Sequence, residues 1–238
     1  MRALLTIGRI VIIIATNIIL SIIALLSLLV EKDGRAYFWA GSSWSKMTLK
    51  ICRVEVRVRG IDNIVPDGAY IFVTNHASMF DIPAIMSVLP RVRIMFKKEL
   101  SYVPLWGWAL KWGHHTMVDR AKGSEAMKSL DRAAAAIKTG GSVILFAEGT
   151  RSRDGKLQPF KRGAFTLAAR SGVPIVPITI NGSFKILPKG SFDIRPNPIE
   201  LVMEKPIDTS NITTREEEIV LMNRVRAIIE REYREDIS

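Results

Sequence analysis

Two short polar clusters carry the residue types that could do chemistry, and each directly follows an apolar, strand-like run. The first places Asp81 five positions after His76, and a histidine with a carboxylate close behind it supplies a general base and its orienting partner. The second runs from Glu148 to Arg151. Its Gly-Thr-Arg turn offers backbone N–H groups, a hydroxyl and a guanidinium to an anion. Together the clusters predict a site that deprotonates a hydroxyl on a phosphate-bearing substrate.

Each cluster also has a simpler interpretation. Asp81 stands before Ile82-Pro83, and an aspartate ahead of an early-helix proline is typical of a helix N-cap. A histidine after a strand is often only a core or surface residue, and Glu-Gly-Thr-Arg can be a turn with solvated charges. The catalytic interpretation is favoured because both clusters follow buried strands, and ligands collect beyond the carboxyl ends of strands in an α/β sheet.

The elements that must position these clusters form one alternating α/β pattern, with no internal repeat. Apolar runs typical of buried strands lie at 71–74, 93–96, 143–146 and 175–180. Alternation of valine with charged residues from Val54 to Val58 predicts an edge strand. Helical stretches with an apolar face, a glycine stop or a capping-box start lie at 125–138, 162–170 and 213–229. The sequence therefore predicts one α/β domain.

An uncharged apolar segment runs from Ile10 to Val30. At about 1.5 Å per residue it is long enough to cross a hydrocarbon core. It exceeds a typical signal-peptide core and no small-x-small cleavage pattern follows it, so we expect a permanent anchor. The aromatic stretch 37–51 predicts a second, amphipathic helix. We expect a monotopic two-helix anchor over residues 1–52, with a true span as the alternative, and a catalytic domain over residues 53–238.

The charge balance indicates an anionic partner. The chain has 34 basic and 23 acidic residues, a formal net charge of +11. Nucleic acid is disfavoured because there is no zinc-finger spacing, RNP-like strand or separate basic helix, whereas phosphate substrates and a membrane phospholipid surface fit. An anionic leaflet favours the cytoplasmic face of a cytoplasmic or inner membrane. We expect no cofactor and no metal, because nucleotide-binding loops are absent and His114-His115 lacks partners at ligand spacing.

Four blocks of this chain resemble a known family. The stretch 75–81 resembles the His-x4-Asp motif of the glycerolipid acyltransferases, the lysophosphatidic acid acyltransferase family. The stretch 146–152 resembles their Phe-Pro-Glu-Gly-Thr-Arg-Ser block, with Ala147 where proline is usual. Residues 97–100 with 118–120 match the block that carries a substrate-binding arginine, and 173–178 resembles the fourth block. The blocks stand in the family's order over roughly residues 54–203.

The resemblance implies a mixed central sheet flanked by helices, behind a membrane-embedded two-helix anchor. It also implies transfer of an acyl group from acyl-CoA or acyl carrier protein to the sn-2 hydroxyl of lysophosphatidic acid, giving phosphatidic acid. His76 would be the general base and Asp81 its orienting partner. Direct attack is favoured because the chain has no Gly-x-Ser-x-Gly nucleophile elbow. The candidate substrate-binding residues are Lys97, Arg120, Glu148, Gly149, Thr150 and Arg151.

Two alternatives stay open at this point. The acceptor could be glycerol 3-phosphate or another lysolipid on the same fold, and the protein could instead be a non-catalytic binder of anionic lipid. The acyl donor and its chain length cannot be read from the residues. The apolar stretch 103–110 could line a slot for the acyl chain, or belong to the core or to a membrane-facing surface.

Overall fold

A computed structural model describes residues 2–118, 123–138 and 140–237. Within them a seven-stranded sheet has the order β1-β7-β6-β2-β5-β3-β4. The strands are β1 (Val56–Arg59), β2 (Ile71–Thr74), β3 (Arg93–Lys97), β4 (Thr116–Val118), β5 (Val143–Phe146), β6 (Ile175–Asn181) and β7 (Ile199–Met203). Pairing is parallel from β6 to β4 and from β1 to β7, but antiparallel between β6 and β7. The predicted mixed sheet is confirmed.

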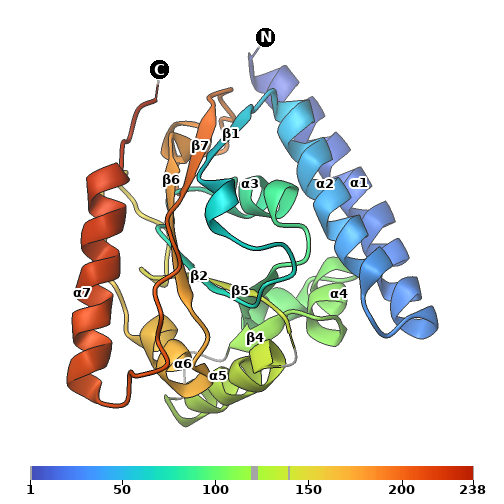
Figure 1. Cartoon of the computed structure of the whole chain (residues 1–238). Helices are drawn as coiled ribbons and strands as arrows, with labels where there is room; N and C mark the ends of the chain where they lie inside the picture. The colour runs from blue at the N-terminus through green and yellow to red at the C-terminus, as the bar shows by residue number, and fades with distance from the viewer. Residues whose placement is uncertain (1, 119–122, 139, 238) are drawn as a thin grey trace.

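Helices cover both faces of this sheet. They are α1 (Arg2–Val30), α2 (Arg35–Cys52), α3 (Asp81–Val88), α4 (Trp106–Trp112), α5 (Gly123–Lys138), α6 (Gly163–Ser171) and α7 (Arg215–Glu232). Short 3-10 turns lie at η1 (Ile61–Asn63), η2 (Lys98–Tyr102) and η3 (Ser183–Lys185). In Figure 1, α5, α6 and α7 lie on one side of the sheet and α1, α2 and α3 on the other.

The core is divided by the sheet, because successive side chains of a strand point to opposite faces. On β2, Ile71 and Val73 join the side chains of α5, α6 and α7, whereas Phe72 joins those of α2 and α3. All four residues of β2 are buried. A strand covered on both faces explains why the sequence shows a continuous apolar run here rather than an alternation.

The register of the central strands brings the two polar clusters together. Thr74 of β2 lies opposite Phe146 of β5 and Ile178 of β6. Because β2 and β5 are parallel and end level, the chain leaves both at the same edge of the sheet. The segments that begin at Asn75 and Ala147 therefore emerge side by side.

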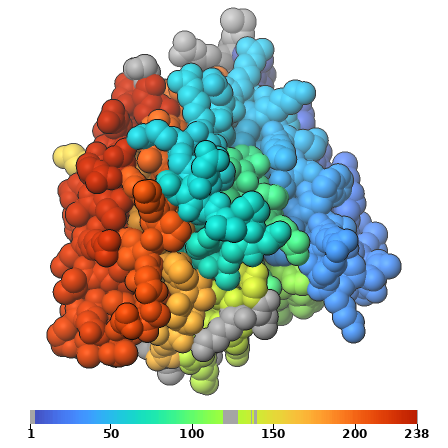
Figure 2. Space-filling model, viewed as in Figure 1, coloured from blue at the N-terminus to red at the C-terminus, as the bar shows by residue number. Residues whose placement is uncertain are grey.

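The two N-terminal helices pack against each other and against the domain. Leu49 and Cys52 of α2 are buried with α3 in the core, and Ile10 and Ile13 of α1 pack against this cluster. The space-filling view shows the blue N-terminal helices directly against the cyan and green segments that follow (Figure 2). Gly34 joins the helices at a φ of 70°, and a Cβ there would lie 2.6 Å from the His114 ring.

Among the residues that the structure describes, none covers one face of α1. The exposed side chains on this face are apolar: Leu4, Leu5, Ile7, Val11, Ile12, Ile14, Ile18, Ile19, Ile22, Leu26, Leu29 and Val30. The part of the chain that the structure describes has one helix that is long enough and apolar enough to cross a membrane, Leu4–Val30. Most of this helix is not buried. A long uncovered apolar face is expected of a helix that contacts lipid.

Candidate active site

His76 and Asp81 form a hydrogen-bonded pair at the carboxyl end of β2. The Nδ1 atom of His76 lies 2.6 Å from Oδ2 of Asp81. The same oxygen accepts the backbone N–H groups of Ala77 at 2.8 Å and Ser78 at 2.9 Å. Asp81 is fully buried, whereas the His76 side chain keeps 16% of its surface exposed. An ionised carboxylate can only accept, so Nδ1 carries the proton and Nε2 is left as the basic nitrogen.

The N-cap interpretation of Asp81 does not fit this geometry. The N-cap residue of α3 is Phe80, and Asp81 is the first helical residue. Its carboxylate bonds backwards, to the loop residues Ala77 and Ser78 and to the imidazole of His76. The helix N-terminus also favours a negative charge at this position. Asp81 therefore folds the loop around His76 rather than capping the helix.

The loop that carries His76 is held from several directions. The side-chain amide of Asn75 pairs with the backbone of Ile180: Nδ2 donates to the Ile180 carbonyl at 2.9 Å, and Oδ1 accepts the Ile180 N–H at 2.8 Å. This pairing ties the start of the loop to β6. The His76 ring stacks on Phe146 with centroids 3.9 Å apart. Ser152 N–H donates to the His76 carbonyl at 2.8 Å. Asn75 and Phe146 each begin one of the two motif stretches, but the sequence alone predicts no role for either.

The Glu148 carboxyl group accepts hydrogen bonds from two backbone N–H groups and does not face the cavity. The residue is 3% exposed. Its Oε1 accepts the N–H of His76 at 2.7 Å, and its Oε2 accepts the N–H of Gln158 at 2.9 Å. Burial raises the pKa of the Glu148 carboxyl to about 7, while these two hydrogen bonds act to lower it. The carboxylate thus fastens the His76 loop to the segment after β5.

The Gly-Thr-Arg turn lies beside this pair. Gly149 has a φ of 71°, and a Cβ there would meet the Lys161 side chain at 3.0 Å, so the turn favours glycine. The Gly149 N–H donates to the Phe146 carbonyl at 2.9 Å. No residue in the described ranges accepts the N–H of Thr150 or forms an ion pair with Arg151. These two groups are therefore available to an anion.

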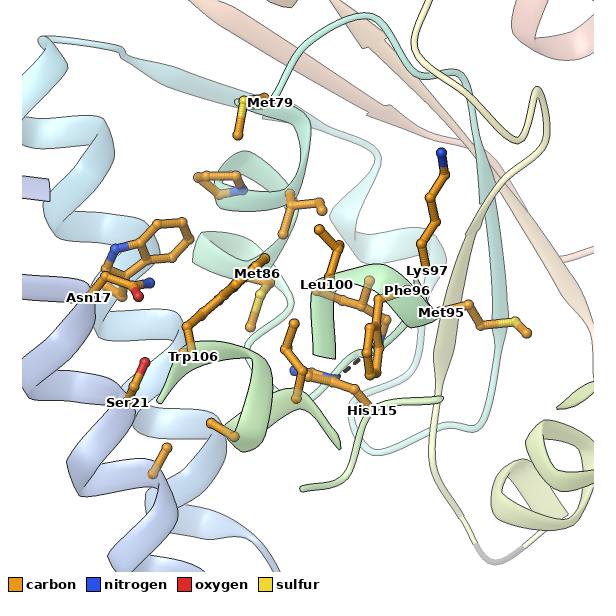
Figure 3. Close-up of a pocket in the computed structure, with 18 of the residues that line it drawn as sticks. Asn17, Ser21, Met79, Met86, Met95, Phe96, Lys97, Leu100, Trp106 and His115 are labelled. Atoms are coloured by element: carbon orange, nitrogen blue, oxygen red, sulfur yellow. Dashed lines mark hydrogen bonds between the residues drawn. The ribbon is translucent and has the colours of Figure 1, made fainter. Parts of the chain in front are cut away.

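A mostly apolar cavity of about 440 Å³ opens beside His76. Its polar lining includes His76, Lys97, Thr150, Arg151 and Lys189. The apolar wall is shared by several elements: Leu20 and Ala24 of α1, Phe38 and Trp44 of α2, Pro83 and Met86 of α3, Phe96 of β3, and Trp106, Ala109 and Leu110 of α4. Figure 3 shows Asn17 and Ser21 of α1 on one side of this space and Lys97 on the opposite side.

The structure brings most of the candidate residues together. His76, Lys97, Gly149, Thr150 and Arg151 line the cavity. Asp81 and Glu148 are buried behind them. Arg120 lies outside the described residues, so its place in the site stays a prediction. Of the candidate slot residues, Trp106, Ala109 and Leu110 line the cavity, whereas Val103 is 43% exposed.

Of the paired histidines, His115 lines the cavity and lies against β3, the strand that carries Lys97. Nδ1 of His115 accepts the Ile94 N–H at 3.2 Å. Burial lowers the pKa of His115 to about 3, and the neighbouring His114 and Arg93 add to the effect. His115 is therefore a neutral wall residue. Among the described residues no group of three or more His, Cys, Asp or Glu side chains could hold a metal ion.

Known proteins that this chain resembles are acyltransferases by name. Residues 55–181 match the family model described as Acyltransferase. A chloroplastic 1-acyl-sn-glycerol-3-phosphate acyltransferase of Brassica napus is 38% identical over 152 residues, which cover 63% of this chain and 44% of that protein. The enzyme of that name from Limnanthes douglasii is 36% identical over 169 residues, which cover 70% of this chain and 59% of that protein. The chain spans about half the length of these curated relatives.

A solved structure matches over nearly the whole length of both chains. The crystal structure of the 1-acyl-sn-glycerophosphate acyltransferase PlsC from Thermotoga maritima has a TM-score of 0.84 and 27% sequence identity. The match covers 98% of this chain and 96% of that one. The N-terminal helices are thus included in the shared fold.

Proposed function

Because this chain belongs to the Acyltransferase family, we propose that it transfers a fatty acyl group from a thioester to the sn-2 hydroxyl of lysophosphatidic acid. The product would be phosphatidic acid. The observation that carries the proposal is the cavity wall itself, where His76, paired with a buried carboxylate, adjoins the cationic turn at Arg151 and a long apolar space. The reaction requires a base, a phosphate site and an acyl slot, and the proposal is supported by a cavity that is lined by a histidine, by cationic groups and by apolar side chains.

The proposed chemistry is direct attack with His76 as general base. Nε2 of His76 accepts the proton of the acceptor hydroxyl while that oxygen forms a bond to the thioester carbonyl carbon. The tetrahedral intermediate then collapses, the C–S bond breaks, and the thiolate takes the proton back from the imidazolium. Asp81 stabilises the imidazolium and keeps Nδ1 protonated. No cofactor is needed in this scheme, since the thioester is itself the activated co-substrate.

The substrates fit the two kinds of wall. A phosphate monoester is held by charge-assisted hydrogen bonds, and Arg151 offers a guanidinium fork for it, with Lys97 and the Thr150 N–H nearby. The hydrocarbon chain of the donor fits the apolar wall built by α1, α2, α3 and α4. Coenzyme A and acyl carrier protein are both suitable thioester carriers, and both are anionic partners for a chain of net charge +11.

We propose that the protein works on a membrane surface. The uncovered apolar face of α1 would enter the lipid, as a monotopic anchor together with α2, and the basic domain would lie against an anionic cytoplasmic leaflet. The relatives from Brassica and Limnanthes carry names that specify a 1-acyl-sn-glycerol-3-phosphate acceptor, which supports the choice of lysophosphatidic acid.

An acceptor panel tests this function. The purified full-length protein in lipid vesicles is offered lysophosphatidate, glycerol 3-phosphate and monoacylglycerol, each with acyl-CoA or acyl carrier protein as donor, and products are identified by mass spectrometry. The expected product is phosphatidate, formed only with a thioester present. Preferential acylation of glycerol 3-phosphate would assign a different acceptor. Vesicle binding without any acyl transfer would indicate a non-catalytic lipid-binding protein.

A further inference from the structure

Lys189 lies outside every motif of this chain, yet it lines the same cavity as His76 and Arg151. Its Nζ donates to Oγ1 of Thr150 at 3.2 Å and to the carbonyl of Arg151 at 3.5 Å. Among the described residues, no carboxylate forms an ion pair with it. A lysine ammonium has three N–H donors. Two of these are used on the Gly-Thr-Arg turn, so one donor and the positive charge are left for a ligand.

The segment that carries Lys189 is tied to the loop of the catalytic base. Ser78, which is fully buried, donates its hydroxyl to the Leu187 carbonyl at 3.2 Å. On the other side of Lys189, the N–H of Arg195 donates to the Ile186 carbonyl at 2.9 Å. These contacts fix the backbone near Lys189 relative to the loop between His76 and Asp81. The fold thus holds the backbone from which the Lys189 side chain reaches Thr150.

We propose that Lys189 binds the phosphate of the acyl acceptor, together with Arg151 and Thr150, and so helps to determine acceptor specificity. This inference rests on the function proposed above. Lys189 contributes a point charge, whereas Arg151 contributes a planar fork. Because Oγ1 of Thr150 accepts the N–H of Lys189, its own hydroxyl proton is free to be donated to a phosphate oxygen. Lys189 therefore acts both directly and by orienting Thr150.

The position of Lys189 favours the acceptor's phosphate over phosphates of the donor. Ser152, the residue after Arg151, donates its N–H to the His76 carbonyl, so the cationic turn and the base are immediate neighbours. In lysophosphatidate, the reacting hydroxyl and the phosphate ester sit on adjacent carbons of glycerol. In both kinds of thioester donor, the whole pantetheine arm separates the thioester from the nearest phosphate. A cation bound to this turn is therefore within reach of the acceptor's phosphate.

Steady-state kinetics of the full-length protein in vesicles test this role. Lys189→Ala should raise the KM for lysophosphatidate about 10-fold or more, the usual effect of losing a hydrogen bond to a charged group, with little change in donor KM. Lys189→Arg keeps the charge and should recover much of the loss. Thr150→Val should also raise the acceptor KM, and adding it to Lys189→Ala should cost less than the product of the two single effects.

A matched lysine on the same segment serves as control. Lys185 pairs with Asp236 and does not line the cavity, so Lys185→Ala should leave both KM values at the wild-type level. A rise confined to the donor KM in Lys189→Ala, or no rise at all while the wild type makes phosphatidate, would overturn the role of Lys189 alone. A wild type that acylates only acceptors without a phosphate would overturn the proposed function and this role with it.

Discussion

At the scale of single residues, we expect the reactivity of His76 to depend on the carboxylate of Asp81, which is shielded from solvent. Asp81 is fully buried and its Oδ2 holds Nδ1 of His76 at 2.6 Å. We expect His76→Ala to lower kcat by about 10²–10⁴-fold, the usual size of general base catalysis. Asp81→Asn should lose much of the same factor, and the double variant little more, because the pair acts as a unit.

Single-turnover and steady-state assays with purified protein measure these effects. Circular dichroism controls for folding, which matters for Asp81 because its carboxylate also holds the N–H groups of Ala77 and Ser78. Near-normal turnover by His76→Ala would exclude it as the base. An acyl–protein adduct trapped during turnover would instead point to a nucleophile on the enzyme.

Arg151 offers a second test at the same scale. Arg151→Ala removes a charge-assisted fork beside the reacting hydroxyl, so the acceptor KM should rise sharply, with a further loss in kcat where positioning suffers. Arg151→Lys should rescue only part of this, because an ammonium cannot reproduce the fork. Acceptor and donor KM are measured separately for each variant. A rise in donor KM alone would assign the turn to the donor's phosphates.

Glu148 predicts a pH dependence of stability. Burial raises its folded-state pKa from 4.5 to about 7. Between these values the folded state binds more protons than the unfolded state, so the free energy of unfolding falls as pH rises. The stabilisation is fully present below about pH 4.5 and is lost by about pH 7, a change of about 3 kcal/mol at most.

Urea unfolding at a series of pH values measures this change against a Glu148→Gln variant. An amide does not titrate, so the decline between pH 4.5 and 7 should be absent from the variant. In Glu148→Gln an NH₂ group, which cannot accept a hydrogen bond, replaces one carboxylate oxygen. Either the His76 N–H or the Gln158 N–H therefore loses its acceptor, and the variant should be less stable than the wild type at low pH. Parallel curves for the two proteins would show that Glu148 is ionised throughout.

At the scale of elements, the features predicted from sequence were those with a local signal. The apolar runs of β2 and β5 gave both strands with their observed bounds, Ile71–Thr74 and Val143–Phe146. The start of α7 was predicted by its capping box, in which Thr214 accepts the Glu217 N–H and the Glu217 side chain accepts the Thr214 N–H. Short elements without periodicity were missed, notably β4, whose three residues are all half-buried.

The site was predictable to the same extent. His76 and Asp81 share one loop, and Arg151 belongs to a contiguous block. The contact of Glu148 with the His76 N–H joins residues 72 positions apart, and that of Lys189 with Thr150 joins residues 39 apart. Such contacts follow from strand register and from the path of the chain after β6. Neither can be predicted from a local sequence pattern. The role of Lys189 therefore required the fold.

The helices that wall the cavity make a prediction about acyl chains. Ser21 of α1 lines the cavity and is 5% exposed. Ser21→Phe would fill part of the apolar space, so kcat/KM for long-chain donors should fall relative to short-chain donors. Ile22→Phe is the control, because Ile22 is 41% exposed and does not line the cavity. Equal effects on all chain lengths would show that the acyl chain lies elsewhere.

At the scale of the whole molecule, we propose that residues 1–52 anchor a catalytic domain formed by residues 53–238, and two truncations test this. A chain starting at Lys32 lacks α1 but keeps Leu49 and Cys52 of α2 in the core. It should stay folded and no longer bind vesicles, because burial of apolar side chains at about 0.8 kcal/mol per CH₂ is lost.

A chain starting at Arg53 also removes Leu49 and Cys52 and uncovers Met86 of α3. It should fold with lower stability than the first truncation. Circular dichroism, thermal unfolding and flotation on liposomes separate folding from membrane binding. If the longer truncation fails to fold while the shorter one folds, α2 belongs to the catalytic domain and the boundary lies before it. If the shorter one still floats, another apolar surface contacts lipid.

The two sides of α1 face different surroundings. Leu20 and Ala24 line the cavity, whereas Ile18, Ile19 and Ile22 on the other side are exposed. One helix thus lies between the cavity and the exposed apolar surface that we propose contacts lipid. In the proposed reaction the acceptor reaches His76 from the membrane as a two-dimensional solute, so its mole fraction in the leaflet, and not its amount per volume of buffer, should set how often His76 meets a hydroxyl. We therefore expect that diluting the acceptor with inert phospholipid slows turnover per protein molecule, whereas diluting the whole suspension with buffer does not, provided that the concentration of the soluble thioester donor is kept constant.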